Sequence, residues 1–152
     1  MTTFFDFEKD FIASLRCIPM IVRYKLDTCG VKLKLDHWHD FNTEEKDNLV
    51  TQPCETAEEI TKYHDDLQAL IKAKTGKYAK ELEVQSNPAW QNKDEIPTSL
   101  QEKTQEFDFQ LTTEQWQKLD DLQRFVLIKL SRPSHENRNF IPALKEFGII
   151  AE

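Results

Sequence analysis

The sequence has very little glycine, three residues in 152. Because glycine supplies the tight turns and unusual backbone angles of loop-rich β folds, this scarcity favours regular secondary structure. Cysteine is also scarce, and its odd count of three does not suit a secreted domain held together by disulfides. We therefore expect Cys17, Cys29 and Cys54 to be reduced thiols in a cytoplasmic protein.

Long apolar runs are absent as well. No stretch approaches the roughly 20 residues that a helix needs to span a bilayer. The first residues, MTTFFDFEKDF, lack the cationic start and the long apolar core of a signal peptide. We expect neither a transmembrane helix nor a membrane partner.

The net charge is −7, from 20 basic and 27 acidic side chains. A protein that binds nucleic acid by neutralising phosphates needs a basic balance, so we expect no nucleic-acid partner. The charge is unevenly distributed: residues 1–35 carry +2, residues 36–123 carry −11 and residues 124–152 carry +2. The basic ends either pair with the acidic middle on folding or form a surface for a partner.

Apolar residues recur at spacings of three and four through most of the chain, which is typical of amphipathic helices. The length of 152 residues suits one domain with a substantial core. We predict an all-α fold, a compact single-domain bundle (residues 1–152) of about six helices with one long polar loop at 86–97. The helices are expected near 4–17, 18–29, 57–75, 98–106, 114–130 and 140–147, with shorter turns at 36–41 and 43–50.

Several helix ends carry local signals. Thr56 and Thr112 are each followed three residues later by Glu or Gln, the pattern of a capping box at a helix start. Asp36 is expected to cap the first short turn, and Gly30 and Gly76 are expected to end helices. The apolar faces between these ends are expected to share one core, which includes Leu15, Val22, Leu26, Trp38, Leu67, Leu70, Trp116, Leu119, Phe125 and Leu127.

Three further patterns are weaker. Val31–Leu35 alternates apolar and basic residues, as a strand does, but no second alternating run is available to pair with it, so we expect an extended linker. Beyond Gly76, a weak helical spacing continues through Tyr78, Leu82 and Val84. The third pattern is a weak internal repeat of residue spacing. It would fit two helical units of similar arrangement, but it does not establish them. Its four members Leu33, Trp38, Phe41 and Leu49 are spaced as are Leu111, Trp116, Leu119 and Leu127.

The sequence offers little catalytic or metal-binding chemistry. His37 and His39 are two residues apart and would point to different faces of a helix, and the cysteine spacings do not suit structural zinc. Gly-x-Ser-x-Gly, Ser-x-x-Lys and His-Glu-x-x-His motifs and glycine-rich phosphate loops are all missing. We predict no catalytic residues, no metal, no cofactor and no disulfide.

Two basic segments near the ends of the chain hold the candidate binding residues. In the first, the arginines and Lys25 are expected off the apolar stripe; in the second, two arginines and a histidine crowd a proline-broken connection. Such groups suit a carboxylate, an anion or an acidic partner, although residues of this kind also cap helices. We expect the segments to meet as one partner-binding surface, made of Arg16, Arg23, Lys25, Lys32, Arg132, His135 and Arg138. The loop at Trp90 is a secondary candidate, although Trp90 could equally anchor that loop to the core.

The stretches FEKDFIASLRCIPMIVRYKLDTCGVKLKLDHW (Phe7–Trp38) and QLTTEQWQKLDDLQRFVLIKLSRPSHENRNFIPALKEFG (Gln110–Gly148) resemble the nitrate reductase-associated protein family, a cyanobacterial-type group of nitrate assimilation accessory proteins. The resemblance implies a non-catalytic factor needed for the maturation or activity of ferredoxin-dependent assimilatory nitrate reductase, which would be its partner. It brings no catalytic residues to carry over. The alternative from a different class is a binder of a small anionic ligand or a molybdopterin-type cofactor. Oligomeric state is not indicated.

Overall fold

The computed structural model describes residues 5–9, 18–84, 88–132 and 139–150. Within them the chain forms eight α-helices and two short 3-10 helices, without a β-strand, so the all-α prediction is confirmed. Most of the helix expected at 4–17 lies outside the described residues, apart from the 3-10 helix η1 (Asp6–Glu8). Among the described residues, no helix combines the length and apolar character needed to cross a bilayer.

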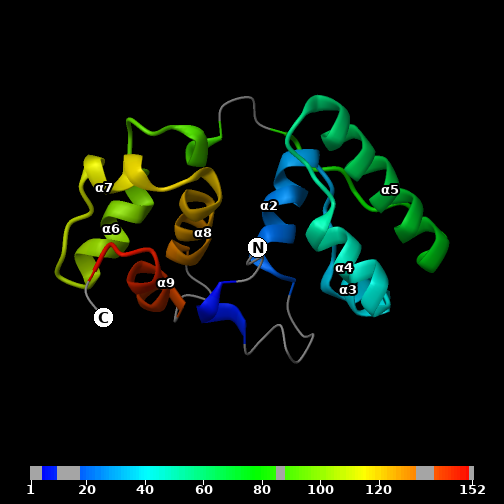
Figure 1. Cartoon of the computed structure of the whole chain (residues 1–152), viewed down its shortest axis with the longest axis horizontal. Helices are drawn as coiled ribbons and strands as arrows, with labels where there is room; N and C mark the ends of the chain where they lie inside the picture. Colours follow the sequence, from blue (N-terminus) through cyan, green and yellow to red (C-terminus); the bar gives the residue numbers. More distant parts are fainter. Residues whose placement is uncertain (1–4, 10–17, 85–87, 133–138, 151–152) are drawn as a thin grey trace. The chain divides into compact units, whose positions relative to one another are not determined.

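The chain divides into two compact units. Glu8–Val84 belong to unit 1, whereas Phe5–Phe7 and Gln85–Glu152 belong to unit 2. Each unit has its own set of helices (Figure 1). That the two units act as one domain with one core stays a prediction.

Unit 1 contains α2 (Met20–Cys29), α3 (Leu35–Asp40), α4 (Thr43–Thr51) and α5 (Ala57–Thr75). The expected ends are confirmed for the two long helices: α2 stops at Gly30, with φ +81°, and α5 begins with a Thr56 capping box and stops at Gly76. The cap predicted for α3 is wrong, because the residue before the helix is Lys34 and Asp36 lies within the first turn. An Asn42 capping box starts α4.

The alternating segment 31–35 forms no strand, but it does find a partner. Val31 makes an isolated antiparallel bridge with Glu81, flanked by Lys32 N to Lys80 O (2.8 Å) and Leu82 N to Gly30 O (2.7 Å). The weak helical spacing beyond Gly76 is therefore misleading, because residues 77–84 form no helix and return beside α5. The bridge fixes residues 80–82 of this segment to residues 30–32, at the end of α2.

Unit 2 contains η2 (Ala89–Gln91), α6 (Thr98–Glu106), α7 (Thr113–Lys118), α8 (Asp121–Ser131) and α9 (Phe140–Glu146). The single helix predicted at 114–130 is wrong: it breaks at Leu119 and Asp120. The cause is a second capping box, in which Asp120 Oδ1 accepts from Gln123 N (2.7 Å) and Gln123 Oε1 accepts from Asp120 N (3.0 Å). The prediction that the apolar second half is buried holds for α8.

Of the predicted core residues, Leu15 lies outside the described residues and Leu70 is only partly buried. The other eight are buried: Val22, Leu26, Trp38, Leu67, Trp116, Leu119, Phe125 and Leu127.

The internal repeat seen in the sequence is also present in the helices and in their caps. Trp38 in α3 and Trp116 in α7 are 78 residues apart, and each is followed by a buried apolar residue and by a capping box that starts the next helix. The same offset relates Pro19 before α2 to Pro97 before α6. It also relates Gly30 to Asp108, a non-glycine residue with positive φ (61°). The order α2–α3–α4 is thus repeated as α6–α7–α8.

Candidate functional site

The predicted basic residues differ in how exposed they are. Arg16, His135 and Arg138 lie outside the described residues, and Lys32 and Arg132 are exposed. Arg23 is half-buried and its Nε donates to Ile18 O (3.0 Å). That the segments meet at one surface stays a prediction.

The expectation that Lys25 lies off the apolar stripe is wrong. Lys25 is buried, and its Nζ donates to Val50 O (2.6 Å) and Gln52 O (2.7 Å). These carbonyls lie at the end of α4, where helix carbonyls lack partners within the helix and a cation is favoured. Burial lowers the pKa of Lys25, although the carbonyls give its ammonium good partners. Lys25 therefore links α2 to α4 and is not part of an exposed surface.

Trp90 also has a structural place. Its side chain is buried and packs edge-on against Phe125, with ring centres 6.4 Å apart. Its carbonyl accepts from Arg124 Nε (2.7 Å). The Trp90 loop is thus fixed to α8, as the core-anchor interpretation of that residue implies.

Arg124 is a buried charged residue that the sequence interpretation missed. It is completely buried, and besides the bond to Trp90 its guanidinium donates to the Trp116 and Leu119 carbonyls and to the Asp121 carboxylate. These groups belong to η2, the end of α7 and the start of α8. A single cation therefore holds the break between α7 and α8 and the Trp90 turn together. The Asp120-x-x-Gln123 spacing was the available signal for that break.

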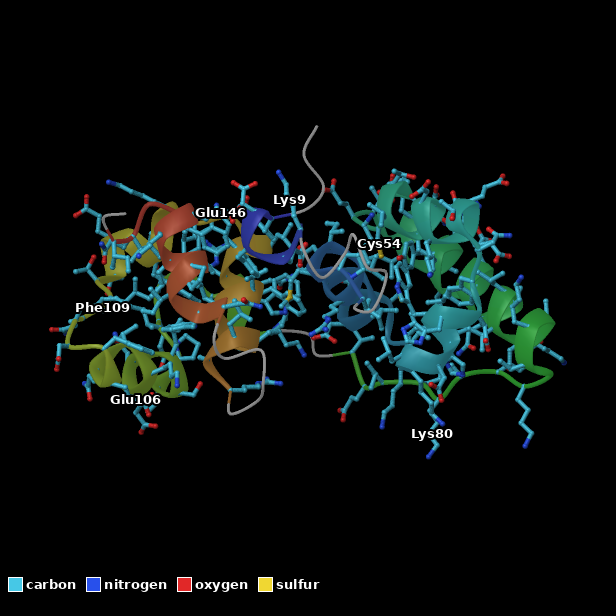
Figure 2. All side chains as sticks on the ribbon, turned by 90° about the horizontal axis from the view of Figure 1, so that it is seen from below. Lys9, Cys54, Lys80, Glu106, Phe109 and Glu146 are labelled. Atoms are coloured by element: carbon cyan, nitrogen blue, oxygen red, sulfur yellow. The ribbon has the colours of Figure 1, made fainter. Side chains whose placement is uncertain are left out.

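The two described thiols are buried in unit 1 (Cys54 is labelled in Figure 2). Burial raises the pKa of Cys29 to about 12 and that of Cys54 to about 11. Burial also raises the pKa of the neighbouring Tyr63, whose hydroxyl donates to Leu49 O (2.7 Å). Burial thus favours the uncharged form of all three groups, whereas the reactive form of cysteine is the thiolate.

His37 Nδ1 accepts from Lys34 N (3.2 Å) and so helps to start α3. Across the described ranges, no group of three or more His, Cys, Asp or Glu side chains is arranged to hold a metal ion.

A cluster of polar groups lies between α5 and the returning segment 77–84. His64 Nε2 contacts Glu81 Oε1 (2.6 Å) and His64 Nδ1 contacts Asp65 Oδ1 (2.9 Å). Gln68 Nε2 donates to Glu81 Oε2 (2.8 Å) and to Ala79 O (3.0 Å), while Gln68 Oε1 accepts from Ala79 N (2.8 Å). We call these residues, with Tyr78, the His64 cluster.

The charges of the His64 cluster are coupled. Hydrogen bonds to Asp65 and Glu81 raise the pKa of His64, because both carboxylates favour the imidazolium. Hydrogen bonds from His64 and Gln68 lower the pKa of Glu81. Sequence reasoning missed the cluster because Glu81 is 17 residues from His64; the only local signal was the i, i+4 pair His64 and Gln68 on one face of α5.

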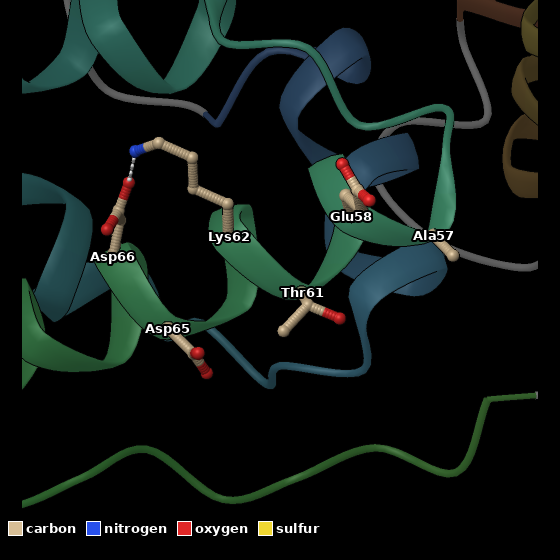
Figure 3. A pocket seen from close by; sticks show the side chains of 6 residues that line it. All are labelled: Ala57, Glu58, Thr61, Lys62, Asp65 and Asp66. Atoms are coloured by element: carbon tan, nitrogen blue, oxygen red, sulfur yellow. Dashed lines mark hydrogen bonds and ion pairs between the residues drawn. The ribbon is translucent and has the colours of Figure 1, made fainter.

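The His64 cluster borders a pocket of about 510 Å³, which Ala69 also lines. A second, shallow pocket of about 630 Å³ shares Asp65 and continues along α5 toward Glu58. Figure 3 shows its lining side chains on successive turns of α5, with Lys62 paired to Asp66. Both pockets are open to the surface, so their polar side chains can be reached by a ligand.

Comparison with known proteins adds the family. Residues 4–147 match the sequence profile of the conserved nitrate reductase-associated proteins. No curated protein and no solved structure matches the chain. Since the profile covers nearly all 152 residues, the chain belongs to the conserved nitrate reductase-associated protein family.

Proposed function

We propose that this protein is a non-catalytic accessory factor that supports the maturation or activity of ferredoxin-dependent assimilatory nitrate reductase through protein–protein contact. The observation that carries the proposal is membership of a nitrate reductase-associated family over residues 4–147. The match spans both compact units, so the proposed role belongs to the whole chain and not to one half of it.

The state of the reactive side chains supports a role without catalysis. A thiol attacks as the thiolate, and the raised pKa values of Cys29 (about 12) and Cys54 (about 11) keep both thiols protonated at neutral pH. The buried Lys25 ammonium is engaged by two carbonyls. These groups stabilise unit 1 and are poor nucleophiles.

The proposed contact surface includes the basic residues near both ends of the chain. Lys32 and Arg132 are the exposed members among the described residues, and Arg16, His135 and Arg138 remain in the proposal from the sequence alone. Exposed charges of this kind raise association rates and select partners more than they set affinity. They contribute on the order of 1 kcal/mol or less to stability, so reversing them leaves the fold intact.

The test uses cells that contain both this protein and nitrate reductase. Removing the protein should lower nitrate reductase activity, the wild-type chain should restore it, and a tagged chain should co-purify with the enzyme. A Lys32→Glu, Arg132→Glu variant should restore less activity, whereas Lys93→Glu, Lys118→Glu, which changes the net charge equally at exposed positions, should restore it fully. Unchanged activity after removal, together with no co-purification, would contradict the proposed function.

The same purification separates the alternative function. A molybdopterin-type cofactor would appear in the absorption spectrum of the purified protein, and a stoichiometric chromophore would replace protein contact by ligand handling. The engagement of Lys25 by protein carbonyls does not favour this alternative, since it removes one of the expected anion-binding cations.

A further inference from the structure

Tyr78 is the most exposed large apolar residue of the described chain, with 63% of its surface accessible. It lies at the rim of the 510 Å³ pocket, which is formed by two segments, α5 and the returning chain after Gly76. An exposed tyrosine beside a pocket is typical of binding surfaces, where Tyr, Trp and Arg carry most of the affinity.

The ring of Tyr78 already receives a cation. Lys72 Nζ lies 4.5 Å from the ring centre. A cation over an aromatic face within about 6 Å is attracted by the ring quadrupole, more strongly for guanidinium or ammonium groups that are shielded from water. The Lys72 contact shows the kind of group that this ring accommodates.

Carboxylates line both pockets along α5. The two pockets are lined by four of them, Glu58, Asp65, Asp66 and Glu81, against Lys62 and His64. Asp65 is common to both pockets, and its side chain is 68% exposed. A ligand that covered both pockets would therefore meet more carboxylates than cations, with Tyr78 and its neighbour Lys72 at one end.

We propose that this face of unit 1, from Glu58 along α5 to Tyr78, docks a basic segment of the partner protein, with an arginine or lysine side chain placed over Tyr78 and against Asp65 and Glu81. The charge is complementary, and the planar guanidinium suits both carboxylates and the aromatic ring. The face differs in sign from the basic residues of the proposed contact surface, so it defines a second contact. Nitrate reductase is its partner only insofar as the proposed function holds.

The first experiment measures the affinity of the full chain for purified nitrate reductase. Tyr78→Ala and Asp65→Lys should each weaken binding roughly tenfold or more, because one removes the aromatic anchor and the other reverses the charge at the shared position. The matched control Glu102→Lys, at an exposed position of α6 with the same change in charge, should alter affinity by less than about twofold. Wild-type affinity in both variants would overturn the docking face while leaving the proposed function standing.

A second measurement does not depend on nitrate reductase. N-acetyl-arginine amide is titrated into the labelled full chain, and amide chemical shifts are followed by NMR. The expected changes are centred on Asp65, Ala69, Tyr78 and Glu81, and they should disappear in Tyr78→Ala. Localised shifts without nitrate reductase binding would keep the docking face and reject the proposed partner. Shifts spread over all carboxylates, or none, would reject the face itself.

Discussion

The α3–α4 pair of unit 1 and the α7–α8 pair of unit 2 share one plan. Trp38 and Trp116 are both buried, and the residues that follow their helices, Phe41 and Leu119, are buried as well. In each pair the side chain one residue before the tryptophan accepts from the backbone N–H that precedes the short helix: His37 in unit 1 and Gln115 in unit 2. The same kind of local capping contact therefore starts the short helix of each pair.

The pairs differ in how their buried donors are satisfied. Trp116 Nε1 donates to Asn92 O (2.7 Å), and Arg124 takes the Trp90 carbonyl, so the η2 turn supplies acceptors for both. In unit 1, Trp38 Nε1 is buried and has no hydrogen-bond acceptor among the described residues, and Lys46 lies 5.5 Å from the Trp38 ring centre. The two pairs of helices are thus alike in backbone but differ in the polar contacts of their interiors. We expect the stability of unit 2 to depend on Arg124 more than that of unit 1 depends on Lys46.

The largest effect is expected at Arg124. Arg124→Met should lower the free energy of unfolding by about 3–5 kcal/mol, because it leaves the buried carbonyls of Trp90, Trp116 and Leu119 without this donor. Lys46→Met, at the equivalent position 78 residues earlier, should cost less than about 1 kcal/mol, because it removes only a cation–ring contact. Urea denaturation monitored by tryptophan fluorescence measures both. Equal losses would show that the two positions are energetically alike.

The next effect concerns two glycines of unit 1. A Cβ at Gly30 would lie 2.8 Å from Leu82 O and 2.7 Å from Val84 Cγ2, at a backbone angle that L residues avoid. Gly30→Ala should therefore cost about 2–4 kcal/mol and disrupt the bridge to residue 81. Gly76→Ala is the matched control, since its φ is similar and a Cβ there would meet no atom of the described residues within 4 Å; it should cost about 1 kcal/mol. Thermal denaturation of the two variants compares them, and equal costs would argue against close packing at Gly30.

A smaller difference should separate the two tryptophans. Trp116→Phe removes the donor to Asn92 O, whereas Trp38→Phe removes an N–H that has no acceptor in the described part of the chain. Both changes lose similar apolar volume, so Trp116→Phe should be more destabilising by about 1–2 kcal/mol. Urea midpoints of the two variants test this, and a larger loss at Trp38 would mean that its N–H has a partner in solution.

The smallest effect is expected at the His64 cluster, which belongs to unit 1. Because the pKa of His64 is raised in the folded state, its imidazolium stabilises the fold at pH values below the unfolded pKa of about 6.5. This stabilisation is lost as the pH rises through the folded pKa. Because the pKa of Glu81 is lowered in the folded state, its carboxylate stabilises the fold at pH values above the unfolded pKa of about 4.3. This stabilisation is lost as the pH falls through the folded pKa. His64→Gln should therefore cost up to about 1 kcal/mol near pH 5.5 and less at pH 8.

The exposed His39 provides the control for that experiment. The unfolding profile of His39→Gln is measured beside that of His64→Gln, as the reference for removing an exposed imidazole from the chain. A His64→Gln profile parallel to the wild-type profile from pH 5 to 8 would mean that the His64–Glu81 contact does not persist in solution.

Where the sequence predicted the structure well, the signal was local. Thr56 with Glu59, Thr112 with Gln115, and glycine at 30 and 76 mark helix ends because the caps act within one turn. The prediction failed where a local pattern was ambiguous. Apolar spacing runs on through Leu119, so it concealed the break that Asp120 and Gln123 cause.

The remaining misses depend on contacts between distant segments. Lysine is ordinarily exposed, and nothing in the α2 sequence indicates that the carbonyls of residues 50 and 52 will meet Lys25. Glu81 reaches His64 only because the chain turns back after Gly76. The candidate face along α5 thus depends on tertiary pairing, which periodicity cannot report.

All three cysteines of the sequence precede residue 85, and the two described ones are buried in unit 1. Alkylating reagents react with thiolate that is accessible, so Cys29 and Cys54 should be modified only when unit 1 opens. The rate of labelling at Cys29 and Cys54 in the absence of denaturant would then report transient opening of unit 1. Tryptophans lie in both units, Trp38 in unit 1 and Trp90 and Trp116 in unit 2, so these thiols are a native probe that reports on unit 1 alone.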